Sequence, residues 1–476
     1  MQHKSSLALA LFGSLTGWIA FVCTTGAVMA GGSLEFVPKA DQKAELSLRV
    51  TNASDGSPLA VRLRIARVGA FEPRRVFVAA DGLQTLELAA GEYRIWASRG
   101  PEWSVAETRT SLRPAQRRVL QLALSRQVEA SGYVSCDLHV HTEASHDSKV
   151  DVTQRLASAA AEGLQFAVIT DHNHVTELPA MPSSAETRLL PGVEVTTWDP
   201  EFGHFNVFPA ASAPSYKHST PERLLSALPA KSGRFMQVNH PRLMRHIGYF
   251  ELQAAKSSRH GVLQAMRQGL DGLEVWNGYD LHRPAERDRV LSDWFELIRH
   301  KRRVVATGGS DSHDLVRTTI GYPRTYVELP VSARTDETYA LQLAAALRAG
   351  RAFVSNGPNI ELRVGELRPG DTLQLARGQT RVPVHVRVAA PTWMDLHTIE
   401  LWVDGRRALT QPIAALASGH KLPNQARAEW AVSLQVGKGS HSIVAMVRGN
   451  RPMDELFDRH DVLPFAFTNP IWIAKH

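Results

Sequence analysis

The sequence predicts an α/β barrel flanked by two β-sandwich domains, and three observations lead to this fold class. Short segments in which apolar and polar residues alternate occupy residues 40–127 and return after residue 356, a pattern typical of half-buried antiparallel strands. Between them, apolar runs alternate with helix-like stretches, which indicates a parallel sheet that closes like a barrel. We therefore expect a leader at residues 1–30, a first sandwich at 31–130, a barrel at 131–355 and a second sandwich at 356–476.

The first 30 residues have the features of an export signal. Lys4 supplies a positive charge, an uncharged apolar stretch runs from Leu7 to Ala30, and Val28-Met29-Ala30 is a small-residue cleavage site. We expect an exported, periplasmic protein with no membrane span after cleavage. An uncleaved membrane anchor is the alternative, because the apolar stretch is longer than a usual signal core.

The strands of both sandwiches are predicted from period-two alternation, with turn pairs such as Asp81-Gly82 and Asp404-Gly405 between them. In the first sandwich they are Glu45–Val50, Val61–Ile65, Thr85–Leu88 and Tyr93–Trp96. In the second they are Ile360–Val364, Val384–Val388, Ile399–Val403 and Ser442–Val447. Nothing catalytic is expected in the first sandwich.

The elements of the barrel are predicted from apolar runs and from helix start and stop signals. The strands are Phe166–Thr170, Phe235–Val238, Leu273–Trp276 and Arg303–Thr307. The helices are Asp151–Glu162, Pro221–Ala227, Pro284–His300 and Asp336–Ala349. Thr220 can cap the second helix, and Gly350 ends the last one.

The composition is that of a globular chain and excludes several classes. Of 476 residues, 43% are hydrophobic and 21% charged, which excludes a disordered or coiled-coil protein. The formal charge is +7, but no Lys/Arg-dense run accompanies it, so no nucleic-acid partner is expected. Two cysteines, Cys23 and Cys136, cannot build a disulfide framework or a cysteine-rich zinc site.

The recognisable chemistry lies in the predicted barrel, where apolar runs end in imidazoles and carboxylates. His139 and His141 share one face of a strand, and further segments follow: Ser145-His146-Asp147, Thr170-Asp171-His172, Gly192-Val193-Glu194, Gly203-His204-Phe205, Asn239-His240-Pro241 and Asp311-Ser312-His313. Each histidine alone is explained as a core or rim residue, but the series favours divalent ions, which offset the cost of burying such groups. The ligand types suit Zn, Mn or Fe, and their number implies more than one ion.

This series resembles the polymerase and histidinol phosphatase (PHP) superfamily of metallohydrolases. The matching motifs span residues 133–313 and include His139-x-His141, Thr170-Asp171-His172, Gly192-Val193-Glu194, Asn239-His240-Pro241 and Asp311-x-His313. The β-domain before the barrel and the ending Thr468-Asn469-Pro470-Ile471-Trp472 are similar to the CehA/McbA branch, which includes carbaryl hydrolases. The resemblance implies a distorted (β/α)7 barrel with two to three divalent ions.

The resemblance also implies which residues hold each ion. The first ion would be held by His139, His141, Glu194 and Asp311. Glu194 would bridge to a second ion held by His204 and His240, and a third would be held by His146, His172 and His313. Asp147 could replace His146, because some relatives have a carboxylate there.

The implied activity is that of a metal-dependent hydrolase with a small-molecule substrate. Two ions bridged by Glu194 would lower the pKa of a shared water and generate hydroxide. The other candidate catalytic residues are Asp311, Asp171 and Arg242. Arg242 would either clamp a phosphate or form a salt bridge at the rim.

The substrate class is left open, with a phosphoester as the first choice. Three divalent ions would outweigh the charge of Glu194 and Asp311, which favours a dianion. The CehA/McbA branch implies instead a carbamate, carboxylic ester or amide, and four aromatic residues could shape an apolar pocket for it: Trp198, Phe205, Trp276 and Tyr279. An inactive exported binding protein is a third interpretation, which the intact ligand series argues against. The sequence predicts no oligomeric state.

Overall fold

The computed structural model describes the chain from Lys43 onward, with gaps. The described residues are 43–69, 75–181, 185–198, 201–215, 217, 220, 223–224, 233–244, 246–254, 261–266, 270–330, 338–416, 426–437 and 439–475. The predicted leader and most of the helix predicted at Pro221–Ala227 lie outside them. Strands contribute more residues than helices, and the predicted mixed α/β class is confirmed.

Residues 43–124 form two sheets around a common core. One sheet has the order β4-β1-β7 and the other β3-β2-β5-β6. Their strands are β1 (Lys43–Asn52), β2 (Val61–Arg67), β3 (Arg75–Ala79), β4 (Leu83–Ala89), β5 (Gly91–Ser98), β6 (Ala106–Leu112) and β7 (Arg117–Leu124). Leu46 and Leu48 of β1 share this core with Leu63 of β2 and Ile95 of β5, because alternate side chains of a strand point to one face.

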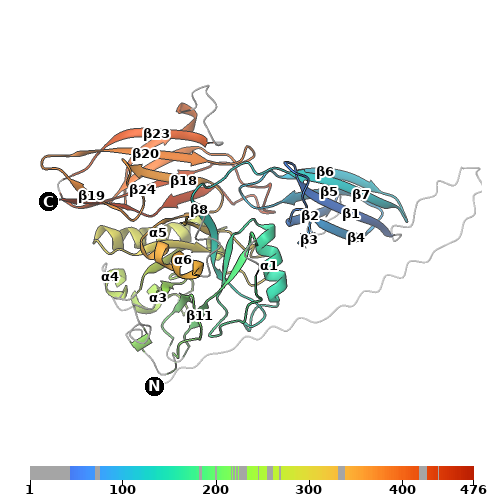
Figure 1. Cartoon of the computed structure of the whole chain (residues 1–476), viewed down its shortest axis with the longest axis horizontal. Coiled ribbons are helices and arrows are strands. Elements are labelled where there is room, and N and C mark those ends of the chain that lie inside the picture. The colour runs from blue at the N-terminus through green and yellow to red at the C-terminus, as the bar shows by residue number, and fades with distance from the viewer. Residues whose placement is uncertain are drawn as a thin grey trace, which may run out of the picture. The chain divides into compact units, whose positions relative to one another are not determined.

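Residues 133–355 contain the described α-helices (Figure 1), which are α1 (Val152–Ala161), α3 (Tyr249–Ala254), α4 (Gly261–Ala265), α5 (Pro284–Arg299) and α6 (Tyr339–Arg348). The strands here are β8 (Tyr133–Val140), β9 (Phe166–Ile169), β10 (Arg188–Pro191), β11 (Val193–Thr196), β12 (His204–Phe208), β13 (Phe235–Val238), β14 (Gly272–Asn277), β15 (Val305–Gly309), β16 (Arg324–Glu328) and β17 (Ala352–Ser355). The predicted strands and the three described helices among those predicted agree with these bounds to within a few residues. Among the described residues, no helix has the length and apolar character needed to cross a membrane.

The strands of this region belong to two sheets, not to one continuous parallel sheet. One sheet has the order β11-β12-β13-β14-β15, and the other contains β10-β9-β8-β16-β17. The pairs β11–β12, β12–β13 and β8–β16 are antiparallel, whereas β8–β9, β9–β10, β13–β14 and β14–β15 are parallel. Single bridges between His172 and Glu194 and between Val140 and Ser312 connect the two sheets.

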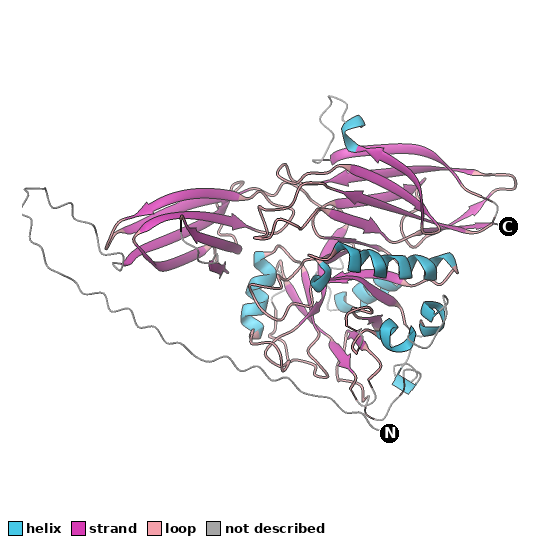
Figure 2. Cartoon of the chain, turned by 180° about the vertical axis from the view of Figure 1, so that it is seen from behind, coloured by secondary structure: helices cyan, strands magenta, loops and turns pink. Residues whose placement is uncertain are grey.

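The last part of the chain continues the hydrogen bonding across the domain boundary expected at residue 355. β17 pairs with β25 (Phe465–Thr468), and the sheet goes on through β24 (His441–Arg448), β21 (Thr398–Val403) and β22 (Arg406–Pro412), with β26 (Ile471–Lys475) and β19 (Thr372–Leu375) off this path. A second sheet, β18-β20-β23, consists of β18 (Asn359–Val364), β20 (Arg381–Ala389) and β23 (Ala426–Gln435). Figure 2 shows that this region is built almost entirely of strands and loops.

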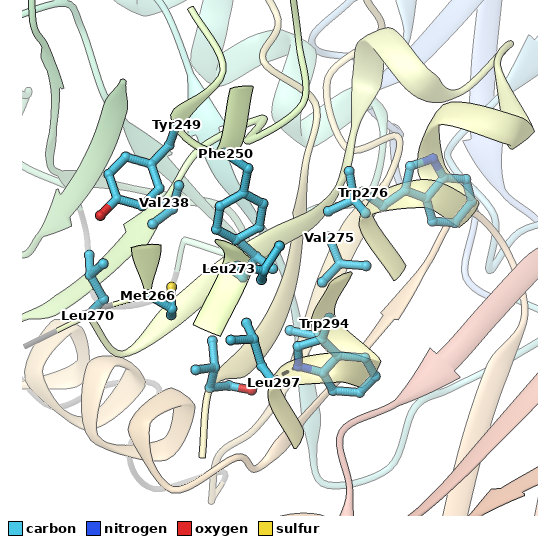
Figure 3. Packing of buried hydrophobic residues seen from close by; sticks show 14 of the residues in the cluster. Val238, Tyr249, Phe250, Met266, Leu270, Leu273, Val275, Trp276, Trp294 and Leu297 are labelled. Atoms are coloured by element: carbon cyan, nitrogen blue, oxygen red, sulfur yellow. Dashed lines mark hydrogen bonds between the residues drawn. The ribbon is translucent and has the colours of Figure 1, made fainter. Parts of the chain in front are cut away.

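The core beside α5 fixes the position of β14. Leu273 and Val275 of β14 lie in the same apolar cluster as Trp294 and Leu297 of α5 (Figure 3). Trp294 is fully buried, and its Nε1 donates a hydrogen bond of 2.8 Å to the Val304 carbonyl. Because side chains alternate along a strand, Glu274, which lies between Leu273 and Val275, points to the opposite face.

Candidate metal centre

Strand β8 presents the first two predicted ligands on one face. His139 and His141 are fully buried, and their ring centroids lie 5.1 Å apart. Leu138 and Val140 alternate with them and pack into apolar clusters on the other side. The period of a strand therefore explains why a His-x-His motif directs both imidazoles to one place.

The other predicted ligands lie at the same edge of the sheets. Glu194 belongs to β11, and the loops after β9, β13 and β15 carry His172, His240, Asp311 and His313. His204 begins β12 instead of following a strand. Because β12 runs antiparallel to β11, Thr196 pairs with His204, and the start of β12 meets the end of β11.

Glu194 lies at the middle of this group. The carboxylate is fully buried, and its two oxygens face five imidazoles. Oε1 lies 3.3 Å from His139 Nε2, 3.1 Å from His204 Nδ1 and 3.2 Å from His240 Nε2. Oε2 lies 2.8 Å from His172 Nδ1 and 3.6 Å from His141 Nε2. Both oxygens therefore have imidazoles around them, as a carboxylate that bridges two ions requires.

Asp311 is the second carboxylate among these imidazoles. Its Oδ1 lies 3.2 Å from the Nε2 atoms of both His139 and His141. Asp311 has a φ of +52°, in the left-handed region that non-glycine residues seldom adopt. Its N–H donates to the His139 carbonyl at 2.9 Å, so a backbone hydrogen bond to another ligand holds this conformation.

A third group of ligand atoms lies beside the first two. Asp147 Oδ2 is 3.4 Å from His172 Nε2 and 3.2 Å from His313 Nε2, and the ring of His313 stacks on that of His141 at 4.0 Å. His146 is exposed, with its ring 5.1 Å from that of His172. Of these two neighbours, Asp147 has the closer contacts with the predicted ligands.

The ligand atoms are arranged as metal sites require. In five groups of three, one ligand atom from each residue lies within 4.8 Å of the others. The groups are His141/His172/His313, His139/Glu194/His240, His139/His141/Asp311, His146/Asp147/His172 and His172/Glu194/His204. Several buried ligand atoms, including His139 Nε2, His141 Nε2 and Glu194 Oε2, form no hydrogen bond. Divalent ions would use the lone pairs that these atoms leave free, so the residues fit a metal centre.

The electrostatics keep both carboxylates ionised. Burial alone would raise the pKa of Glu194, but the imidazoles of His139, His172 and His204 hold it well below its usual range. The pKa of Asp311 is likewise well below its usual range, because His139 and His141 outweigh burial. Burial lowers the pKa of His141 to about 3, so its imidazole is uncharged at neutral pH.

Asp171 and Arg242, two candidate catalytic residues, have other partners. Asp171 accepts from the backbone N–H and hydroxyl of Thr142, both at 2.6 Å, and from Ser145 Oγ at 2.8 Å. The hydroxyl of Thr176 is its fourth donor, and Ser145 Oγ connects it to His141 Nδ1 at 2.9 Å. Arg242 donates to Asp293 at 2.7 and 3.0 Å and to Glu251 at 3.2 Å. These bonds are the ones expected of the salt-bridge interpretation.

Glu274 and Asn277 support the centre and were not among the predicted site residues. Glu274 Oε1 lies 3.0 Å from His139 Nδ1, and Asn277 Nδ2 donates to Asp311 Oδ2 at 3.2 Å. The sequence feature that could have identified Glu274 is a lone carboxylate within an apolar run. Leu273-Glu274-Val275 has the same pattern as Val193-Glu194-Val195. Both glutamates are almost fully buried.

Arg155 is a second kind of support that the sequence did not reveal. It projects from α1, which begins with a capping box of Asp151 and Gln154. Its guanidinium donates to the His141 carbonyl at 3.0 Å and to the hydroxyl of Ser312 at 2.9 Å. Burial lowers the pKa of Arg155 to about 10, so it remains charged at neutral pH and joins the backbones of two ligand segments.

The four aromatic residues near the motifs divide into two classes. Phe205 and Trp276 are buried in the apolar core, so they do not form a substrate pocket. Trp198 and Tyr279 are 66% and 40% exposed. Met244 and Val316, each within four residues of a predicted ligand in the chain, are 50% and 58% exposed. Large apolar side chains are therefore available to solvent on several ligand-bearing loops.

Comparisons with known proteins place the chain in no family. No family model and no curated protein matches it. A solved (S)-allantoin synthase aligns at 18% identity over 20% of this chain and 44% of its own, with a TM-score of 0.17. A lytic polysaccharide monooxygenase from Jonesia denitrificans aligns at 12% identity over 38% of this chain and 93% of its own, with a TM-score of 0.14. A β-glucuronidase from Bacteroides uniformis aligns at 10% identity over 92% and 58%, with a TM-score of 0.15.

Proposed function

We propose that this protein is a metal-dependent hydrolase of the PHP superfamily, exported to the periplasm by residues 1–30. The observation that carries the proposal is the surroundings of Glu194, whose oxygens lie within 3.6 Å of five imidazoles. A buried carboxylate that only stabilises a fold is usually paired with Arg or Lys, whereas imidazoles are ligands for divalent ions. The bridges from β9 to β11 and from β8 to the end of β15 support a distorted (β/α)7 barrel.

The chain's own residues prepare the centre for hydrolysis. Bound divalent ions supply Lewis acidity and a nucleophile made from water at neutral pH. Glu194 and Asp311, both ionised, would hold adjacent ions, and His139 would contribute to the same positions. Asn239 Nδ2 donates to Glu194 Oε1 at 2.8 Å and so fixes the orientation of the bridging carboxylate.

A phosphoester is the first candidate substrate, on the ground of charge. Two to three divalent ions carry more positive charge than Glu194 and Asp311 neutralise, and an anionic substrate would compensate the remainder. Arg242 contributes nothing to this argument, because its guanidinium is bonded to Asp293 and Glu251.

A carboxylic ester, amide or carbamate is the second candidate, and a specific observation favours it. Trp198, Met244 and Val316 are exposed on loops that follow predicted ligands, and Tyr279 is exposed after β14, which carries Glu274. Apolar side chains at the mouth of a site favour substrates with apolar groups. Glu274 and Asp147 also place further negative charge beside the ligands, which reduces the preference for a dianion.

Metal analysis tests the hydrolase proposal. We expect the purified mature protein to retain about two to three transition-metal ions per chain, because the ligand groups share Glu194 and His172 between adjacent positions. Elemental analysis after metal-supplemented expression measures this. A content below about one ion per chain would contradict the proposal.

A comparison of two substrates separates the candidates. The same metal-loaded preparation is assayed with an aryl phosphate and with an aryl N-methylcarbamate that share one leaving group. A preference for the phosphate supports the first candidate, and a preference of about tenfold, or 1.4 kcal/mol, for the carbamate establishes the second. Activity on neither, in a protein that retains its ions, would favour the interpretation as a binding protein.

A further inference from the structure

Two buried carboxylates stand directly behind the predicted ligands. Glu274 Oε1 lies 3.0 Å from His139 Nδ1, and Oε2 accepts from the His240 N–H at 2.8 Å and from Asn277 Nδ2 at 2.9 Å. Asn277 Nδ2 also donates to Asp311 Oδ2 at 3.2 Å. Glu274 and Asn277, which we call the Glu274 hub, thus contact three predicted ligands, and neither belongs to a candidate metal group.

Asp171 is the carboxylate behind the other side of the centre, and it acts through Ser145. Ser145 Oγ donates to Asp171 Oδ1 at 2.8 Å, lies 2.9 Å from His141 Nδ1 and accepts from the His172 N–H at 3.1 Å. We call Asp171 and Ser145 the Asp171 hub. Its partners are His141 and His172, and those of the Glu274 hub are His139, His240 and Asp311.

These hydrogen bonds decide which ring nitrogen faces the ions. An imidazole that donates its Nδ1–H to an oxygen behind it keeps a lone pair on Nε2. His139 Nε2 and His141 Nε2 form no hydrogen bond, and each lies 3.2 Å from Asp311 Oδ1. Each hub therefore fixes a ring with its free nitrogen toward the carboxylates.

The Glu274 hub also supports strained backbone. His240 has a φ of +24° and Asp311 a φ of +52°, conformations that non-glycine residues seldom adopt. The His240 N–H donates to Glu274, and the Asp311 side chain accepts from Asn277. Loss of this hub would free His240 from the position in which it meets Glu194, and Asp311 from the position in which it meets His139 and His141.

We propose that each hub controls a metal position that the other hub does not touch, an inference that rests on the proposed metal-dependent function. The position formed by His139, His141 and Asp311 takes ligands from both hubs. The Glu274 hub sets the position formed by His139, Glu194 and His240. The Asp171 hub sets the position formed by His141, His172 and His313, of which it holds two residues. Glu274 and Ser145 are thus positioning residues, which act on the ions through the imidazoles.

The test is stepwise metal removal from the full-length holoprotein with a chelator, followed by elemental analysis and by the absorption spectrum of the Co²⁺-substituted protein. Glu274→Gln should lower the affinity for one ion, and Ser145→Ala should lower the affinity for another, each by about 10- to 100-fold. Ser145→Thr keeps the hydroxyl, so it should retain the ion affinity that Ser145→Ala lowers. The Co²⁺ spectrum should differ between the two weakened variants, because different positions lose their geometry.

The matched control is Glu162→Gln, which alters a carboxylate that is 2% exposed and contacts no predicted ligand among the described residues. Its affinity for each ion should equal that of the unaltered protein. If Glu274→Gln does not fold, Asn277→Ser removes the hydrogen bonds of Asn277 to Glu274 and Asp311. It should lower the affinity for the same ion, because Glu274 then loses one of the bonds that orient it. Unchanged ion affinities in the hub variants, a loss confined to one and the same ion in both, or an equal loss in Glu162→Gln would overturn the inference. If the unaltered protein itself binds no ions, the proposed function has failed instead.

Discussion

Two buried glutamates of this chain have opposite surroundings. Glu162 is 2% exposed at the end of α1, where Oε1 lies 2.6 Å from Arg62 Nε and Oε2 accepts from the Tyr322 hydroxyl at 3.0 Å. Glu194 is fully buried and faces five imidazoles and the amide of Asn239. One carboxylate has a permanent cation as its partner, and the other has partners that can lose their protons.

This difference separates a structural site from a metal site. A guanidinium stays protonated at every physiological pH, so the pair of Glu162 and Arg62 is complete without any further ion. Imidazoles release protons near neutrality, and a metal ion can then take the place of those protons beside Glu194. One buried glutamate, Glu162, therefore joins β2 to the end of α1, and the other, Glu194, belongs to a candidate ligand set.

The largest effect is expected when Glu194 is replaced by Ala. This change removes the shared carboxylate from two of the candidate groups, so hydrolysis should fall to background and the protein should lose at least one ion. Elemental analysis and turnover of the preferred substrate measure the two effects, and circular dichroism checks that the sheets are retained. Unchanged turnover in the folded variant would refute the role of Glu194.

The pH dependence of metal binding should show the next largest effect. In the metal-free protein, burial lowers the pKa of His172, but Glu194 and Asp147 outweigh burial and raise the pKa to about 10. A raised folded pKa contributes stability that is complete below the unfolded value near 6.5 and is lost as the pH rises through about 10. An ion must displace this proton, so its affinity rises with pH.

We therefore expect the increase in Tm on adding Zn²⁺ to grow between about pH 6 and pH 9, in the range below the folded pKa of His172. Differential scanning calorimetry with and without the metal measures it. The variant Glu162→Gln should show the same trend, because Arg62 does not titrate in this range. A metal effect independent of pH would mean that the ions do not bind through these imidazoles.

The sequence predicted much of the fold because local patterns determine its elements. Alternation located β1 and β2, an apolar run located β13, and the helix predicted at Pro284–His300 is α5. The sequence did not predict that β12 pairs antiparallel with both its neighbours, or that β17 pairs with β25. Pairing between distant strands depends on tertiary packing, which no local period encodes.

The candidate ligands could be located in the sequence because most of them follow or belong to an apolar run. The support behind them could not, because its pairs are far apart in sequence: Glu274 and His139 are separated by 135 residues. The relation of Asp171 to His141 passes through a serine hydroxyl, and serine is too common to mark a site. Only the folded structure shows that the residues of each of these pairs lie close together.

A smaller effect, on stability alone, is expected from Glu162→Gln. The change leaves Arg62, which is 6% exposed, without its anionic partner, and breaking a buried ion pair costs about 3–5 kcal/mol. Urea denaturation of the metal-saturated protein measures the free energy of unfolding. The metal content should be unchanged, and a loss of ions would mean that the two glutamates are not independent.

The smallest effect is expected from His146→Ala, and Asp147→Ala is its counterpart. Asp147 lies 3.4 Å from His172 Nε2 and 3.2 Å from His313 Nε2, so its loss should weaken one ion by about tenfold or more. Both residues are exposed, but the ring of His146 lies 5.1 Å from that of His172, so its loss should change that affinity by no more than about twofold. Chelator titration of both variants measures the difference. An equal loss in the two would mean that His146 moves inward when the ion binds, as the family resemblance implies, and a loss confined to Asp147→Ala would assign this ligand position to the carboxylate.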